Sequence, residues 1–206
     1  MNSLLISSSK GLGMSPKTEK EKMLAGELYS AFDPELAQLH AVARRLMHEH
    51  NISHPDNIEQ RKDIMRRLLG AIGTDFVVRP PFYCDYGCNI FVGDRIFINY
   101  DCTILDCNIV HIGNDVLIGP KVQIYTASHP IDPELRLSAL ELAVPVSIGD
   151  NVWLGGGVIV CPGVSIGSNV TIGAGSVVTR DIASDVVAAG NPCRIIKSTT
   201  QSSLDT

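Results

Sequence analysis

A six-residue period dominates the second half of this 206-residue chain. Written in sixes, residues 144–191 read VPVSIG, DNVWLG, GGVIVC, PGVSIG, SNVTIG, AGSVVT, RDIASD and VVAAGN. Aliphatic residues occupy the third and fifth places of most of these hexads, and glycine recurs at the sixth place. The same phase is present upstream, between residues 88 and 125, in CNIFVG, DRIFIN, NIVHIG, NDVLIG and PKVQIY. A repeat of this length predicts a parallel β-helix, in which short strands stack coil upon coil.

Each hexad supplies one short strand and one corner, and three hexads complete a triangular coil. The aliphatic side chains stack with those of the coils above and below, and glycine at the sixth place lets the corner adopt a positive φ. The composition agrees with a narrow interior, because aromatic residues are 5% of the chain and Trp153 is the only one after Tyr125. We therefore predict an all-β repeat domain over residues 76–197.

A helical segment precedes the repeats, over residues 16–75. Thr18-Glu19-Lys20-Glu21 fits a capping box, and the helical spacing of apolar residues continues from there to Tyr29. Asp33-Pro34 is a second helix start. A third helix is expected from about Asp56 to Leu69, with Ile58 facing inward. The histidines of this segment are expected to be solvated or packing residues; they are His40, His48, His50 and His54.

The repeats stop between Tyr125 and Val144, where the chain reads TASHPIDPELRLSALELA. Two prolines and the length of this interval predict a loop extruded from the prism over residues 126–143, and a loop of this length is usually functional. Residues 1–15 are rich in Ser and Gly and are expected to form a disordered tail, and residues 198–206 are expected to form a C-terminal tail.

Charge and hydropathy exclude several classes of protein. A net charge of −5 argues against a nucleic-acid binder, whose surface would be basic. No run of about 18 apolar residues is present, so no membrane span is expected, and the N-terminus does not resemble a secretory signal. We therefore expect a cytoplasmic protein with free, mostly buried thiols. Cys84 and Cys88 resemble half of a zinc site, but no second pair follows at a suitable spacing, so no metal is expected.

Several stretches resemble the maltose and galactoside O-acetyltransferases of the left-handed β-helix acyltransferases, and the maltose enzymes resemble this chain most. The stretches are TEKEKMLAGELY (18–29), YCDYGCNIF (83–91), FINYDCTILD (97–106), YTASHPIDPE (125–134), SIGDNVWLGGGVIVCPGVSIG (147–167) and VVAAGNPCRIIK (186–197). The resemblance, rather than the period, implies a left-handed coil and a homotrimer with active sites between neighbouring prisms. It also implies transfer of an acetyl group from acetyl-CoA to a hydroxyl of a small sugar, such as maltose, glucose or a galactoside.

Transfer from a thioester to an alcohol needs a base for the hydroxyl proton, and histidine suits that role because its ordinary pKa lies near neutrality. The repeat domain has two histidines. His111 lies within a regular hexad, whereas His129 lies at the base of the loop and matches the family's catalytic histidine. Direct attack on acetyl-CoA then follows, without a covalent enzyme intermediate. The resemblance implies that Asn99 lies near the thioester and the acceptor; the residues alone also fit a corner amide.

The resemblance implies further contacts to coenzyme A. Gly156 stands where the family offers a backbone amide to the thioester carbonyl, which is the place of an oxyanion donor. The other positions that match the coenzyme groove are Asn99, Ala174, Thr179, Arg180 and Arg194. An arginine can hold a phosphate through charge-assisted hydrogen bonds, although either arginine also fits an ordinary surface position.

Asp85 and Asp106 match positions that face the hydroxyl-bearing acceptor, and a carboxylate can accept hydrogen bonds from sugar hydroxyls. Both would repel an anion, so the expected acceptor is a neutral sugar. Glu141 lies late in the loop and is a candidate to orient His129. The galactoside enzymes carry an acceptor-binding aspartate where this chain has Ala31, which weakens the case for a galactoside.

Other interpretations remain open. One is an acetyltransferase with a different acceptor, such as serine, an antibiotic or an amino sugar. A zinc β-helix hydratase needs three histidine ligands, and the repeats contain two. A non-catalytic β-helix scaffold is disfavoured by the loop that carries His129. A cysteine nucleophile is not expected, because no histidine is adjacent in sequence to Cys102, Cys107 or Cys161.

Overall fold

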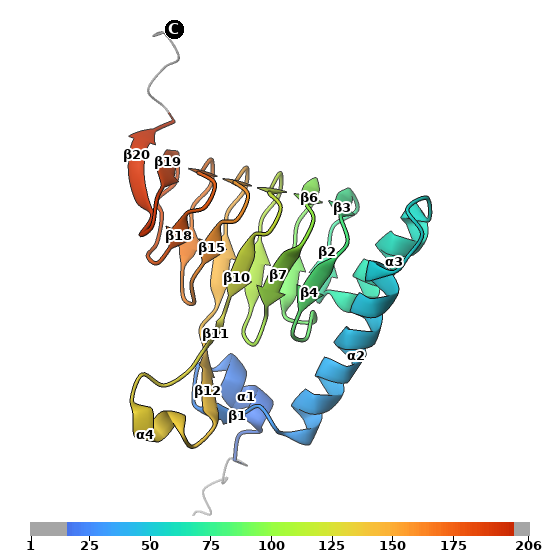
Figure 1. Cartoon of the computed structure of the whole chain (residues 1–206), viewed down its shortest axis with the longest axis vertical. Coiled ribbons are helices and arrows are strands. Elements are labelled where there is room, and N and C mark those ends of the chain that lie inside the picture. The colour runs from blue at the N-terminus through green and yellow to red at the C-terminus, as the bar shows by residue number, and fades with distance from the viewer. Residues whose placement is uncertain (1–15, 200–206) are drawn as a thin grey trace, which may run out of the picture.

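The computed structural model describes residues 16–199, and most of them form a stack of β-coils (Figure 1). The chain passes in turn through three walls of parallel strands, which are named here by their first strand. Helices α2 (Pro34–Asn51) and α3 (Ile58–Leu68) cover the end of the stack where the first coil lies. The antiparallel pair β19–β20 closes the opposite end. The expected tail at 1–15 and residues 200–206 lie outside the described residues.

Three sheets form the walls. The β2 sheet contains β2 (Ala71–Ile72), β5 (Ile90–Val92), β8 (Val110–Ile112), β13 (Val146–Ile148) and β16 (Ser165–Ile166). The β3 sheet contains β3 (Phe76–Val78), β6 (Ile96–Ile98), β9 (Leu117–Ile118), β14 (Trp153–Leu154), β17 (Thr171–Ile172), β19 (Val186–Ala189) and β20 (Arg194–Ser198). The β4 sheet contains β4 (Phe82–Cys84), β7 (Cys102–Leu105), β10 (Gln123–Tyr125), β15 (Ile159–Val160) and β18 (Val177–Val178).

The hexad places predicted to face inward do so. Val146, Ile148, Val152 and Leu154 are each at most 3% exposed, and the same alternation runs through every coil. Ser176 occupies an inward place where the other hexads have valine. Its hydroxyl donates to the carbonyl of Gly173 at 2.5 Å and accepts from the amide of Gly190 at 3.0 Å, so this buried hydroxyl is satisfied.

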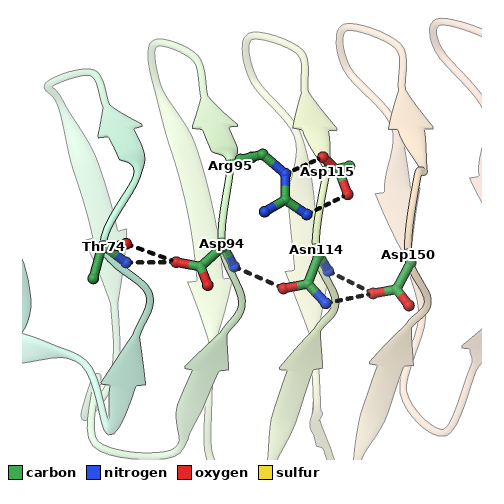
Figure 2. A network of polar contacts seen from close by, with 6 residues as sticks. All are labelled: Thr74, Asp94, Arg95, Asn114, Asp115 and Asp150. Atoms are coloured by element: carbon green, nitrogen blue, oxygen red, sulfur yellow. Dashed lines mark hydrogen bonds and ion pairs between the residues drawn. The ribbon is translucent and has the colours of Figure 1, made fainter.

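A ladder of polar side chains runs along the corner between the β2 and β3 sheets (Figure 2). Each side chain accepts from the backbone amide of the coil before it: Asp94 Oδ1 from Thr74 at 2.6 Å, Asn114 Oδ1 from Asp94 at 2.9 Å, and Asp150 Oδ1 from Asn114 at 2.6 Å. Arg95 and Asp115 pair beside the ladder. These bonds satisfy corner amides that no strand partner reaches.

The reason for glycine at this corner differs from the prediction. Gly149 does not adopt a positive φ; Asn151, two residues later, does, with φ of 53°. An added Cβ at Gly149 would lie 2.6 Å from Ser168 Oγ, and one at Gly113 would lie 2.5 Å from Asp150 Oδ1. Glycine is therefore required because neighbouring corners approach closely, while Asn and Asp accept the left-handed conformation.

The helix starts in the N-terminal segment follow the sequence signals. Thr18 and Glu21 form the capping box of α1 (Glu19–Leu24), and Asp33 caps α2. The helix does not continue to Tyr29, because Gly26, with φ of 71°, follows its end, and Tyr29 belongs to strand β1 (Tyr29–Ser30). Ile58 was expected to face inward, but it is 59% exposed because the buried stripe of α3 begins six residues later, at Ile64.

Between β10 and β13 the chain leaves the coil. It forms β11 (Ala127–Ser128), the short helix α4 (Pro133–Arg136) and β12 (Leu140–Ala143). Strand β12 lies between β11 and β1 in a separate antiparallel sheet, close to α1 (Figure 1). The excursion is therefore anchored to the N-terminal segment through the pairing of β1 with β12.

Candidate active site

His129 follows β11 directly. Strands β11 and β12 pair with Ala127 opposite Ala143 and Ser128 opposite Leu142. His129 is the residue after Ser128 on one strand of this pair, and Glu141 is the residue before Leu142 on the other. His129 is exposed, so a substrate can reach its ring.

Glu141 is held from its other side by the N-terminal segment. Tyr29 of β1 lies opposite Glu141, and its hydroxyl donates to Glu141 Oε2 at 3.0 Å. Tyr29 is fully buried. Burial, followed by the neighbouring Cys107 and Glu141, raises the pKa of Tyr29 far above its ordinary value, so its hydroxyl remains a donor. Since opposite residues project to one face of an antiparallel sheet, the side chains of Tyr29 and Glu141 share a face.

Asp85 lies in the same cluster, at the corner that follows β4. The thiol of Cys107 donates to Asp85 Oδ2 at 3.2 Å. Burial raises the pKa of Asp85 and Glu141 raises it further, whereas the thiol hydrogen bond and His40 lower it. The chain thus places two carboxylates, Asp85 and Glu141, near each other beside the base of the excursion.

Asp106 was expected to face the acceptor, but the structure buries it completely. Its Oδ1 accepts from the amides of Asp85 and Tyr86 at 3.0 and 2.8 Å, and its Oδ2 accepts from the amide of Asn89 at 3.2 Å. A sugar therefore cannot reach this carboxylate without unfolding the corner. Burial raises the pKa of Asp106 to about 6, and the backbone hydrogen bonds oppose that rise. The Asp106 carboxylate therefore bonds to the turn that contains Asp85 and Tyr86.

The predicted coenzyme residues Asn99, Gly156 and Ala174 stack along a different corner, where the chain enters the β4 sheet. Gly175 donates to the carbonyl of Gly156 at 2.9 Å, which aligns successive coils. Within residues 16–199, neither the amide of Gly156 nor that of Ala174 donates to a protein acceptor. Both are at least partly exposed, so they are available to a ligand. Asn99 Oδ1 accepts from the amide of Tyr100 at 2.8 Å.

Thr179, Arg180 and Arg194 lie at the C-terminal end of the coil. Thr179 and Arg180 follow β18, and Arg194 opens β20. The two arginines line one pocket of ≈ 360 Å³ together with Cys193. All three of the expected side chains are exposed. Two guanidinium groups on one pocket form a suitable surface for a polyanion.

The structure groups the candidate residues at two edges of the β4 sheet. Asn99, Gly156 and Ala174 lie where the chain enters this sheet, whereas Asp85 and Arg180 follow its strands β4 and β18, and His129 lies on the excursion that leaves the coil after β10. A strand of three residues spans roughly 10 Å. In the described part of the chain, no hydrogen bond joins the two groups.

Sequence reasoning missed Tyr29 and Cys107, which bond to the two carboxylates. Tyr29 was assigned to a helical stripe, and Gly26 was the signal that the helix ends before it. Cys107 gave no local signal, since its contact with Asp85 spans 22 residues.

The cysteines do not resemble nucleophiles. All six are free. Burial raises the pKa of Cys102 to about 11 and also raises those of Cys107 and Cys161, so the reactive thiolate is disfavoured. Within residues 16–199, no three metal-binding side chains are grouped to hold an ion, and no helix there has the length and apolar character of a membrane span.

Two family descriptions match the chain. Residues 22–73 match the maltose acetyltransferase hexapeptide capping motif, and residues 145–180 match the bacterial transferase hexapeptide of six repeats. Nodulation protein L of Rhizobium meliloti is 51% identical over 179 residues, which are 87% of this chain and 98% of that protein.

Solved structures give the same picture. A maltose O-acetyltransferase from Clostridium difficile 630 superimposes with a TM-score of 0.88 at 52% identity, covering 88% of this chain and 97% of that one. A galactoside acetyltransferase in complex with coenzyme A gives a TM-score of 0.85 at 38% identity, covering 89% and 92%. The predicted fold, a left-handed parallel β-helix with an N-terminal helical segment, is confirmed.

Proposed function

The chain belongs to the maltose and galactoside O-acetyltransferase family of hexapeptide-repeat acyltransferases, and on that premise we propose that it acetylates a hydroxyl of a small neutral sugar with acetyl-CoA. The observation that carries this proposal is the exposed His129 directly after β11, on a hairpin whose other strand, β12, carries Glu141. A reaction that consumes acetyl-CoA fits a cytoplasmic enzyme.

His129 is the general base. Its imidazole accepts the proton of the sugar hydroxyl while that oxygen attacks the thioester carbonyl. When the carbon–sulfur bond breaks, the coenzyme leaves as a thiolate and takes the proton from His129, so the enzyme returns to its starting state. Glu141 orients the ring and stabilises the imidazolium, as a carboxylate does in other histidine bases. Tyr29 fixes Glu141 through its 3.0 Å hydrogen bond.

The unpartnered amide of Gly156 is the oxyanion donor. A backbone N–H that is not bonded to protein costs no reorganisation when charge develops on the carbonyl oxygen. Asn99 lies at the same corner, and its side chain reaches the thioester region in this proposal. The amide of Ala174, one coil further on, continues a line of donors for the pantetheine arm.

The coenzyme then runs along the coil towards its C-terminal end. Thr179, Arg180 and Arg194 meet its phosphates there, because the two arginines share one pocket. Asp85 and Glu141 accept hydrogen bonds from hydroxyls of the acceptor at the other end of the groove. Their negative charge disfavours a sugar phosphate.

We assign the two edges of the β4 sheet that form one active site to neighbouring chains of a homotrimer. A hydroxyl and a thioester must approach to about 3–3.5 Å to react, whereas the two edges of the β4 sheet are separated by a strand. If the exit edge of one prism faces the entrance edge of the next, His129 and Gly156 meet across the interface.

Labelled acetyl-CoA and a panel of glucose, maltose, a β-galactoside and glucose 6-phosphate test the proposal. We expect label on the neutral sugars and free coenzyme A in equal amounts, with no label on the phosphate. Transfer to serine or to an amino sugar, with no transfer to neutral sugars, would refute the proposed acceptor class. It would leave the assignment of acetyltransferase activity unchanged.

A further inference from the structure

A pocket of ≈ 260 Å³ lies between α2, α3 and β3, and no residue assigned to acetyl transfer lines it. His50, in the last turn of α2, is one of its lining residues and is 1% exposed. Within residues 16–199, neither ring nitrogen of His50 has a hydrogen-bond partner. Burial and nearby Arg61 lower the pKa of His50 to about 4, so the ring is neutral at pH 7. A neutral imidazole offers one donor and one acceptor, and both are unused here.

One side of the pocket is apolar. Met65 and Phe76 are 1% and 2% exposed and line its depth, while Ile58 and Val77 are 59% and 44% exposed and line it as well. Exposed aliphatic surface beside a pocket favours binding of an apolar ligand group, because that group removes the surface from water. The pocket is smaller than a site for a drug-sized ligand, which has roughly 300–1,000 Å³.

The other side is cationic. Arg61 donates from Nε and Nη2 to the hydroxyl and carbonyl oxygens of Ser53, at 2.7 and 2.9 Å, which fixes its guanidinium. Its Nη1 has no acceptor among the described residues. Lys62 and Arg79 also line the pocket, and no acidic residue of the described chain does. Lys62 pairs only distantly with Glu59, at 3.7 Å.

We propose that this pocket binds a small carboxylic acid with an apolar body, such as an aromatic or short aliphatic acid. The carboxylate lies at Arg61 and Lys62 and accepts a hydrogen bond from His50, and the apolar body packs on Ile58 and Phe76. A carboxylate matches the planar fork of arginine, and it needs the one donor that a neutral imidazole supplies.

The experiment is a titration of the full chain with benzoate, followed through the ring resonances of His50 by NMR. We expect saturable binding, with benzyl alcohol at least about tenfold weaker because it lacks the charge. Arg61→Met should weaken benzoate by about tenfold or more. Arg67→Met is the matched control, since Arg67 pairs with Glu49 and Asp63 outside the pocket.

Lys62→Met is the second variant, in case loss of the Ser53 bonds unfolds α3, and it too should weaken benzoate. Equal affinity for benzoate and benzyl alcohol, or shifts of His50 that neither variant alters, would overturn the proposal. So would a crystal soaked in benzoate that shows only water beside His50. None of these measurements uses acetyl transfer, so the outcome is independent of the proposed enzymatic activity.

Discussion

Replacement of Asp106 by asparagine tests whether this residue holds the acceptor corner rather than the acceptor itself. Both carboxylate oxygens accept backbone amides, from Asp85 and Tyr86 at Oδ1 and from Asn89 at Oδ2. An asparagine keeps one of these acceptor positions and places an NH₂ group at the other. At best the Asn89 amide is left buried without an acceptor, which costs about 1–3 kcal/mol. For a chain of this size, a loss of roughly 2 kcal/mol lowers Tm by about 5 °C.

Thermal unfolding and two-substrate kinetics measure the result. Asp106→Asn should melt about 5 °C lower and should raise KM for the sugar, because Asp85 is displaced, with KM for acetyl-CoA unchanged. Asp150→Asn is the control, since Asp150 also accepts a corner amide but is exposed. An Asp106→Asn protein with unaltered Tm and a raised sugar KM would show that Asp106 contacts the acceptor after all, and the present assignment would be wrong.

Three further predictions concern other sites. His129→Ala should fold normally and lose roughly 10²–10⁴-fold in kcat, with little change in acetyl-CoA affinity; near wild-type turnover would place the base elsewhere. Arg180→Ala and Arg194→Ala should each raise KM for acetyl-CoA about tenfold or more and leave the sugar KM nearly unchanged, whereas equal effects on both would mean that these arginines support the fold. The pKa of His50 is lowered from 6.5 to about 4 in the folded state, so stability is present above pH 6.5 and is lost as pH falls towards 4. Between pH 7 and 5 the free energy of unfolding of the wild type should therefore fall by about 2 kcal/mol through this group. The His50→Leu variant should not show this loss, and urea unfolding at both pH values measures the difference.

The coil could be predicted because its information is local and repeated. The third and fifth places of each hexad predict the inward-facing residues, and Val152 and Leu154, which occupy these places, are buried. The reason for glycine at the sixth place could not be predicted from a single hexad. Gly149 is needed because Ser168 of the next coil approaches it, and a contact between coils depends on how the coils stack, which one hexad does not specify.

A residue of the candidate site could be predicted only where a local sequence motif marks it. His129 stands out because the repeat breaks beside it. The partners of the carboxylates do not, since Tyr29 reaches Glu141 across 112 residues and Asp106 reaches the amide of Asp85 across 21. The sequence motif predicts a role for Asp106. It does not predict whether the carboxylate oxygens face a sugar or the backbone, because that depends on burial in the folded chain.

A site shared between chains makes a prediction that no single-chain site makes. His129→Ala and Asn99→Ala alter opposite edges of the β4 sheet, so each variant alone should be nearly inactive. The two variants are unfolded and refolded together in equal amounts to form mixed trimers. A site in these trimers is intact when the chain that supplies its exit edge has His129 and the neighbouring chain that supplies its entrance edge has Asn99. Each of these two conditions holds with a probability of about one half, so about a quarter of the wild-type activity should return. Refolding each variant by itself is the control and should restore nothing. A mixture that assembles into trimers by light scattering and stays as inactive as the separate variants would place His129 and Asn99 in one chain's site, and the interface argument would fail.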